Sequence, residues 1–578
     1  MKKRYLVTLA CILTAALAAG CGSAKTNSGN GGPGDGMTAQ EAQTPEVAGD
    51  GLGNADGAGN GSGNGTAKGA NNGTEGSASR QVVAYVGQDL FDGNYDPLMS
   101  DVYSRGYMLF HSGLLKIDSS SNVQPDLATD YSISGDGLTY TFTLRQDAMF
   151  SDGERLTAED VAFTYNKAKE LASPGIDLTR MIKASAPDEA TVEVTLSEPS
   201  SNFLVTAAQL GIVPEHAYGD GYGATGIGSG PWKYVQLDVD QQLIVEPNEY
   251  YYGQKPALDR VTFLKLDNDA ALAAAKSGQL DIVMVSPEYA LEEVEGMHLE
   301  RLKTMDIRNI NLPVVPAGEM DGVAVGNDFT CDPSVRKAIA IGLDRQKVID
   351  QALNGIGKPA YGLSTNLPWA KTVDYADGQV EEAVKLLEEA GWKDTDGDGI
   401  REKDGVKAEF AVDTASNEMD RYNVAMAVSE QMRALGINMT VNTVTWDDIE
   451  QFGHSDGVVW GWGSFNPDLV YSLYSEHALD PAGSPYSNNA VYVNETTDSY
   501  IDQALSATTD KEANELWKMA QDDGKQGPNY DYPYLFIVNI EHCYFVKDGL
   551  NIHTETQIPH PHGHGLPVIC NMNQWEWK

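Results

Sequence analysis

The sequence predicts an α/β protein, because strand-like and helix-like segments alternate along most of the chain. Residues 139–144, TYTFTL, alternate threonine with large apolar side chains, which is typical of a half-buried strand. A turn is predicted at 152–153, and Thr157 then stands three residues before Asp160, a spacing that favours a capping box at a helix start. About 500 residues of this character are enough to bury two or more hydrophobic cores.

Capping residues and apolar spacing predict further elements. Asp332, followed by proline, predicts one helix start, and Asp344 predicts another. Apolar residues at helical spacing predict a helix closed by Gly391 and another over 422–435. The alternating segment 437–444, INMTVNTV, predicts a strand after the second of these helices. No internal repeat accompanies the alternation.

The N-terminus predicts export. Basic residues at 2–4 precede an apolar segment at 5–19 that is too short to span a bilayer comfortably, and small residues lead to Cys21. We therefore expect a signal peptide over residues 1–20. A cysteine in this place resembles a bacterial lipobox, which implies a diacylglycerol on the Cys21 thiol and an acyl chain such as palmitate on its amine. An ordinary signal peptide with an incidental cysteine is the alternative.

The next segment has the composition of a linker. Residues 22–80 consist mainly of Gly, Asn, Ser, Ala and Thr and lack the large apolar residues that a core requires. Residues 21–80 are therefore expected to form a lipidated N-terminus followed by a disordered tether. A Gly-rich coil of this length spans about 40 Å between its ends.

Charge and cysteine usage exclude some functions. With 40 basic and 83 acidic residues the formal net charge is -43, which argues against a nucleic-acid partner. No cysteine pair has C-x-x-C metal-site spacing. Outside the N-terminal segment three cysteines remain, which allow at most one disulfide: Cys331, Cys543 and Cys570.

Short motifs give no sign of catalysis. Residues 221–226 match G-x-G-x-x-G, but no predicted helix follows, so a dinucleotide site is not expected. Residues 394–399, DTDGDG, begin like an EF-hand loop, yet Gly405 stands where a bidentate Glu is required, so an acidic turn is favoured. Hydrolase, zinc-protease and phosphate-loop motifs are absent from the sequence, and we expect no enzyme activity.

A set of ordered segments is similar to the family 5 extracellular solute-binding proteins, which are the dipeptide, oligopeptide and nickel receptors of ABC importers. Together these segments extend the resemblance over nearly all of residues 81–578. These segments are 136–167, 211–218, 228–234 (GSGPWKY), 246–263, 332–349, 383–405 and 460–468 (WGWGSFNPD).

The resemblance implies a two-lobed fold like that of periplasmic binding proteins, with discontinuous lobes and a hinge. Lobe I would comprise 81–305 and 535–578, with an extra subdomain at about 116–227, and lobe II would comprise 306–534. The implied function is that of an extracytoplasmic, lipid-anchored and monomeric receptor. It would capture a small solute, expected to be a peptide, by lobe closure and deliver it to the permease and ATPase subunits of an importer.

The segment 458–474 is the expected ligand-binding segment. Its candidate residues are Trp460, Gly461, Trp462, Phe465, Asn466 and Asp468. Both tryptophans lie on one side of the predicted strand, where aromatic rings suit a ligand, with core packing as the alternative. In peptide-binding relatives an aspartate three residues after such a tryptophan holds the peptide's α-amino group. Here Phe465 or Gly463 takes that position, which leaves Asn466 or Asp468 as substitutes.

Histidines near the C-terminus suggest a second function. His560, His562 and His564 alternate with other residues, an arrangement that nickel or zinc would accept. A metal or metal-chelate receptor is therefore the alternative function. The interleaved prolines and glycines favour a structural turn with hydrogen-bonded histidines over a metal site.

Overall fold

The computed structural model describes residues 80–578 except 88–89, 92, 100–106, 174, 365–366, 372, 374 and 560–566. The chain divides into two units, Met1–Gly76 and Ser77–Lys578, and the fold described here is that of the second. The expected signal peptide, Cys21 and nearly all of the tether lie outside the described residues. So do His560, His562 and His564.

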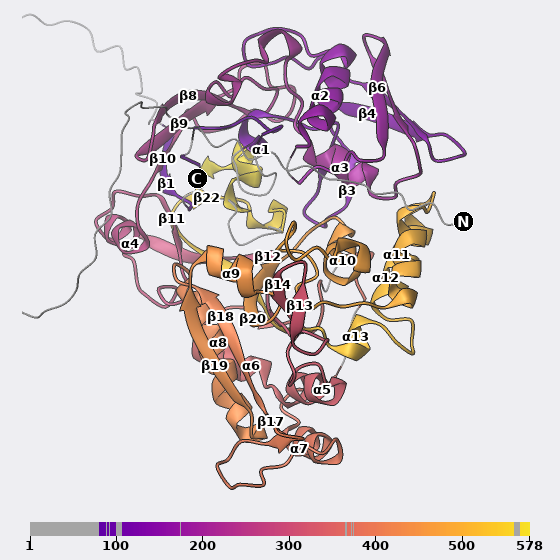
Figure 1. Cartoon of the computed structure of the whole chain (residues 1–578). Helices are drawn as coiled ribbons and strands as arrows, with labels where there is room; N and C mark the ends of the chain where they lie inside the picture. The colour runs from indigo at the N-terminus through magenta and orange to yellow at the C-terminus, as the bar shows by residue number, and fades with distance from the viewer. Residues whose placement is uncertain are drawn as a thin grey trace, which may run out of the picture. The chain divides into compact units, whose positions relative to one another are not determined.

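An eleven-stranded mixed sheet runs through the described chain (Figure 1). β18 pairs in parallel with β19 and β20, and β1 pairs in parallel with β10 and β11, whereas the other pairs are antiparallel. In sheet order the strands are β19 (Asn438–Val444), β18 (Glu409–Ala415), β20 (Gly457–Trp462), β12 (Met297–Asn311), β21 (Tyr534–Lys547), β11 (Ile282–Val285), β1 (Gln81–Tyr85), β10 (Arg260–Leu264), β9 (Gln242–Pro247) and β8 (Trp232–Asp238), with β15 (Lys358–Pro359) on β21.

Helices and short hairpins complete the α/β architecture that the sequence predicts. The helices are α1 (Tyr107–Phe110), α2 (Ala158–Leu171), α3 (Phe203–Gln209), α4 (Asn268–Lys276), α5 (Pro333–Gly342), α6 (Arg345–Ala352), α7 (Val380–Glu389), α8 (Met419–Met432), α9 (Trp446–Phe452), α10 (Asp468–Tyr474), α11 (Glu495–Leu505), α12 (Asp510–Gln521) and α13 (Pro528–Asp531). The two-stranded pairs are β2 (Leu115–Ile117) with β3 (Val123–Pro125), β13 (Gly318–Met320) with β14 (Val323–Val325), β16 (Glu402–Lys403) with β17 (Val406–Lys407), and β22 (Leu550–Asn551) with β23 (Glu576–Trp577).

Two long strands, β12 and β21, lie together in the middle of the strand order. On one side of them stand strands from 409–462 and on the other side strands from 81–285, so the chain passes between the two groups twice. The pairing of β12 with β21 shifts register between Lys303 and Ile307. The lobe boundaries expected at 305–306 and 534–535 fall in or beside these strands, and they remain predictions.

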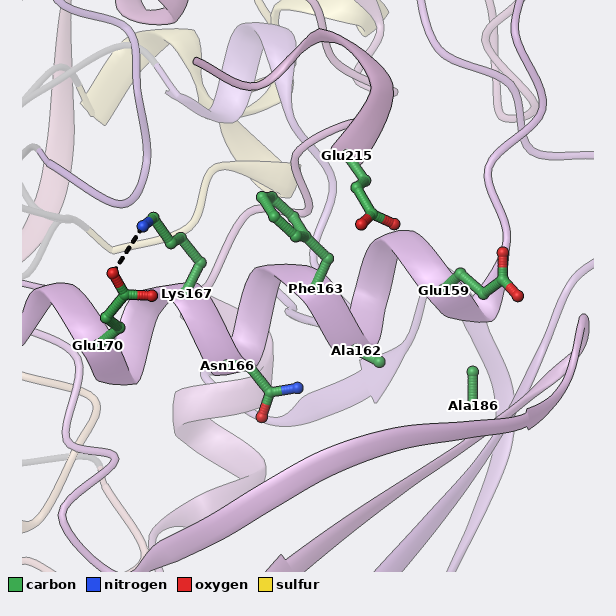
Figure 2. A pocket seen from close by; sticks show the side chains of 8 residues that line it. All are labelled: Glu159, Ala162, Phe163, Asn166, Lys167, Glu170, Ala186 and Glu215. Carbon is green, nitrogen blue, oxygen red and sulfur yellow. Dashed lines mark hydrogen bonds and ion pairs between the residues drawn. The ribbon is translucent and has the colours of Figure 1, made fainter. Parts of the chain in front are cut away.

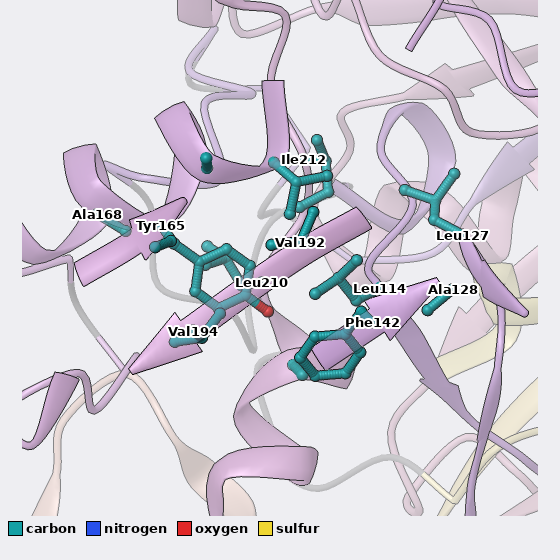
Figure 3. Close-up of a cluster of buried hydrophobic side chains, with 14 of the residues drawn as sticks. Leu114, Leu127, Ala128, Phe142, Tyr165, Ala168, Val192, Val194, Leu210 and Ile212 are labelled. Atoms are coloured by element: carbon teal, nitrogen blue, oxygen red, sulfur yellow. The ribbon is translucent and has the colours of Figure 1, made fainter. Parts of the chain in front are cut away.

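A separate four-stranded antiparallel sheet contains the 139–144 segment. Its order is β4 (Ala128–Ile133), β5 (Thr139–Leu144), β7 (Thr191–Leu196) and β6 (Met181–Asp188). The apolar face of β5 is buried as predicted, and Figure 3 shows Phe142 among the buried side chains that α2 and β7 supply. The N–H of Thr157 donates to Asp160 Oδ2 at 2.9 Å, which confirms the predicted start of α2.

The other predicted helices form, with small differences at their ends. Asp332 and Asp344 cap α5 and α6 with their side chains, as predicted. The helix expected over 422–435 begins three residues earlier than predicted, because α8 starts at Met419. Its predicted end is confirmed, because α8 continues as a 3-10 turn to Leu435 and Gly436 closes it with a φ of 73°. α7 ends at Glu389, two residues before Gly391, which takes a positive φ of 95°.

The cysteines and the turn motifs have simple structural roles. Cys331, Cys543 and Cys570 are free thiols, so none of the disulfides that the sequence allows is present among them. Residues Tyr222–Ala224 of the glycine-rich segment form a single 3-10 turn, and the next element is the strand β8, so no helix follows the motif, as predicted. In the described part of the chain, no helix is both long and apolar enough to cross a membrane.

Candidate functional site

The candidate site lies where three neighbouring parallel strands end. β18, β19 and β20 lie side by side with their carboxyl ends at one edge of the sheet (Figure 1). In open α/β sheets ligands bind outside this edge, because the loops that follow the strands converge there. Trp446 follows β19, and the segment 463–467 follows β20. Two of the expected ligand-binding residues, Trp462 and Phe465, therefore come to the edge that suits a binding site.

Trp460 and Trp462 share one face of β20, but they differ in environment. Their ring centroids are 5.5 Å apart. Trp460 is 3% exposed, and its Nε1 donates to Asn311 Oδ1 at 3.0 Å. This burial favours core packing for Trp460. The Trp462 side chain is only partly buried, and its Nε1 atom is itself buried, with no hydrogen-bond partner among the described residues. Trp462 is thus the tryptophan of this strand that can contact a ligand.

Two further aromatic rings extend this group away from Trp462. Trp446 lies 6.4 Å from Trp460 between ring centroids, and Tyr486 lies 6.0 Å from Trp460. Trp446 opens α9 directly after β19, with Thr445 as the helix cap. The sequence analysis did not identify Trp446, although its place two residues after the predicted strand 437–444 is a signal that could have found it, whereas nothing in the sequence connects Tyr486 with this site.

The opposite face of β20 covers buried charges. A Cβ atom built on Gly461 would lie 2.3 Å from Arg308 Nη1, so only glycine leaves room for this guanidinium. Arg308 pairs with Asp306 at 2.5 Å and with Asp420 at 3.2 Å. Burial opposes the charge of Arg308, but the two carboxylates outweigh it and raise the pKa of the guanidinium. The requirement at Gly461 is therefore structural.

Arg421 belongs to the same buried charge group. Its guanidinium pairs with Glu418 and donates from Nη1 to the carbonyl of Val459 at 2.7 Å. Burial, followed by the nearby charge of Arg308, lowers its pKa. Glu418 is partly buried and follows β18, so a carboxylate lies at the same sheet edge as Trp462.

The residues after Trp462 form a tightly hydrogen-bonded loop. The carbonyl of Phe465 accepts from Trp369 Nε1 at 2.9 Å. Asn466 Oδ1 accepts from the N–H of Asp468 at 3.0 Å, which closes a turn at the start of α10. The Asp468 carboxylate accepts from Asn202 Nδ2. Both residues that the sequence offered as amine anchors are therefore occupied by bonds within the protein.

The electrostatics of Asp468 also disfavour amine binding. Burial, followed by the negative charge of Asp177, raises its pKa to about 7, although Asn202 and Arg180 act in the opposite direction. Near neutral pH a substantial fraction of this carboxyl group is protonated. A protonated acid does not form an ion pair with an α-ammonium group.

Two surface hollows lie elsewhere in the described chain. One, of about 480 Å³, lies along α2, beside β6 of the four-stranded sheet (Figure 2). There Lys167 pairs with Glu170 at 2.8 Å. The other, of about 550 Å³, lies beside the acidic turn. In that turn Asp394 accepts from the N–H groups of Gly397 and Gly399, which confirms the predicted turn.

Comparison with known proteins identifies the family. The model of the bacterial extracellular solute-binding proteins, family 5, matches residues 122–478. The chain belongs to this family. Protein XP55 of Streptomyces lividans is 32% identical over 474 residues, which cover 78% of this chain and 84% of that protein. The oligopeptide-binding protein AppA of Bacillus subtilis is 29% identical over 490 residues, covering 79% and 85%.

Solved structures support the two-lobed fold. NikZ from Campylobacter jejuni, in complex with Ni(L-His), superposes with a TM-score of 0.71 at 22% identity, over 86% of this chain and 100% of that chain. AppA from Bacillus subtilis, in complex with a nonapeptide, gives a TM-score of 0.65 at 24% identity, over 86% and 99%. The family 5 protein described here is thus a substrate-binding component of an ABC transporter that works outside the cytoplasm.

Proposed function

We propose that this protein is a lipid-anchored receptor that captures peptides and delivers them to the permease of an ABC importer. The observation that carries the proposal is Trp462, a partly buried indole with an unpartnered Nε1 among the described residues, at the carboxyl edge of β18, β19 and β20. An aromatic wall of this kind accommodates varied side chains. The similarity to an oligopeptide-binding protein over 85% of its length supports the choice of peptide.

The mechanism rests on closure. A ligand that contacts both lobes stabilises the closed population, and the permease then recognises the closed form. Cys21 would hold the protein at the membrane through its lipid, and the tether would let the body turn toward the permease. No step of this function requires the protein to make or break a covalent bond in its ligand.

Ligand identification tests the proposal directly. Mass spectrometry of small molecules released by denaturing the purified protein should find peptides. Those peptides should then change the tryptophan fluorescence of the refolded protein and compact it in solution scattering. Trp462→Ala should weaken binding by about 1–3 kcal/mol if the indole stacks on the ligand. Trp577→Phe, a change in the C-terminal strand β23, is the matched control. Equal affinity in both variants would remove Trp462 from the site.

A metal-chelate receptor is the second candidate, favoured by the alternation of His560, His562 and His564. Metal analysis of the protein purified without chelators tests it. Stoichiometric nickel or zinc that is lost in the triple alanine variant would support this candidate. Metal that persists in that variant, without released peptide, would point to a chelate bound elsewhere and would also reject the peptide proposal.

A further inference from the structure

A seam of hydrogen bonds joins the four-stranded subdomain to the helices α10 and α11. Asn202 at the start of α3 donates from Nδ2 to the Asp468 carboxylate at the start of α10. Beside it, the N–H of Ser201 donates to the carbonyl of Leu505 at 3.3 Å. Arg180 Nη1 donates to the same carbonyl at 2.9 Å. We refer to these five residues as the seam.

The two sides of the seam are far apart in sequence and are expected to belong to different lobes. Arg180, Ser201 and Asn202 fall within 81–305, and Asp468 and Leu505 fall within 306–534. The bond from Asn202 to Asp468 spans 266 residues of chain. If the lobes separate, these bonds break together and the Asp468 carboxylate returns to water.

The positive charge near Asp468 is too weak to stabilise the ionised form of its carboxyl group. Burial and the negative charge of Asp177 raise its pKa, whereas Asn202 and the more weakly acting Arg180 lower it, and the result is about 7. On its own helix the titratable neighbour is Tyr471, which is neutral because burial and acidic neighbours raise its pKa. From α11, Asp498 and Asp502 add negative charge near that tyrosine. The joined seam thus favours a protonated Asp468.

We propose that Asp468 and Asn202 form a proton-sensitive latch, in which joining the seam transfers one proton from solvent to the Asp468 carboxylate. The proton adds to one carboxylate oxygen, and the carbonyl oxygen of the resulting acid continues to accept from Asn202 Nδ2. The latch rests on the proposed function to the extent that the seam joins when the lobes close. Asp468 acts here as a positioning residue for closure.

The direction of the pH effect follows from the two states of Asp468. With the seam apart, the carboxyl group is solvated and its pKa is about 3.9. With the seam joined, the pKa is about 7, so joining takes up a proton below that pH. Joining is therefore favoured as the pH falls from 8 toward 4. Between pH 8 and pH 6 the equilibrium constant for joining should rise about tenfold.

Hydrogen exchange of the full mature chain tests the latch without any ligand. The Ser201 amide donates across the seam, so its protection, corrected for the pH dependence of intrinsic exchange, measures the joined fraction. In the wild type this protection should be about tenfold greater at pH 6 than at pH 8. In Asp468→Asn the side chain is a neutral amide at every pH. Protection of the Ser201 amide in this variant should therefore be independent of pH, and it should be high at pH 8.

Two further variants complete the test. Glu381→Gln, a change at an exposed site on α7, should keep the wild-type pH dependence. Asn202→Ala should lower protection more at pH 8 than at pH 6, because a hydrogen bond to a charged acceptor is the stronger one. The latch is overturned if protection of the Ser201 amide in the wild type does not change with pH. It is also overturned if Asp468→Asn shows the same pH dependence as the wild type. If Asp468→Asn does not fold, the Asn202→Ala result decides alone. The mass-spectrometry search for bound peptides does not depend on the pH dependence of the seam, so failure of the latch and failure of the proposed function are distinguishable.

Discussion

Replacing Gly461 with alanine should destabilise the body by displacing a buried guanidinium. The added Cβ would lie 2.3 Å from Arg308 Nη1, and an ordinary contact of about 3.5 Å requires a shift of about 1 Å. Arg308 is held at 2.5 Å from the fully buried Asp306 and has little room to move. A charge-assisted hydrogen bond contributes about 1.5–3 kcal/mol, and breaking a buried ion pair costs about 3–5 kcal/mol. We expect Gly461→Ala to lower the free energy of unfolding by about 2–3 kcal/mol.

Urea unfolding, followed by circular dichroism, measures this loss. The matched control is Gly318→Ala in β13, where an added Cβ would meet nothing nearer than the Pro316 carbonyl at 3.9 Å. A double-mutant cycle with Arg308→Lys assigns the cause, because lysine keeps the charge but lacks the Nη1 atom that Gly461 accommodates. The cycle should show that Gly461→Ala does less harm in the Arg308→Lys background. Equal stability of the two alanine variants, or an additive cycle, would refute the reasoning.

Three further outcomes can be measured. Trp460→Ala should lower the free energy of unfolding by about 3–5 kcal/mol, because it removes a buried indole and its bond to Asn311, and urea unfolding would detect this. Cys21→Ser should release the protein from membranes without changing its melting temperature, and cell fractionation with a thermal scan checks both results. N-acetylation of a peptide released from the protein should change its affinity little, because Phe465 stands where peptide-binding relatives have the amine-anchoring aspartate and Asp468 is bonded to Asn202. Calorimetric titration with both forms of the peptide measures the effect. A large loss of affinity on acetylation would show that another carboxylate binds the amine.

Local patterns predicted the elements of the fold because their causes are local. A capping side chain bonds to backbone groups two or three residues away, so Asp332 and Asp344 predict the starts of α5 and α6 from the sequence alone. The alternation in 139–144 similarly fixes which face of β5 is buried, whatever packs against it. The tightening of the last turn at 433–435 was less predictable, because this turn uses the same residue types as the helix before it.

The candidate site depended on contacts that no local pattern contains. Alternation placed Trp460 and Trp462 on one face of β20, but it did not tell which of them would be covered. Asn311, which bonds the Trp460 indole, lies 149 residues earlier in the chain. Gly461 likewise suggested a ligand contact, whereas its neighbour across the sheet is Arg308 on β12. Pairing of distant strands decided the role of each residue.

Asp468 illustrates how the fold can reassign a residue that the sequence places correctly. Its position after an aromatic strand end made it a candidate for binding a peptide amine. The same position opens α10, where Asn202 at the start of α3 donates to the Asp468 carboxylate. A carboxylate buried in this contact is stabilised by protonation, which weakens it as an ion-pair partner. Glu418, which follows β18 at the same sheet edge, is likewise paired, with Arg421, so a peptide amine bound there would have to compete with that ion pair.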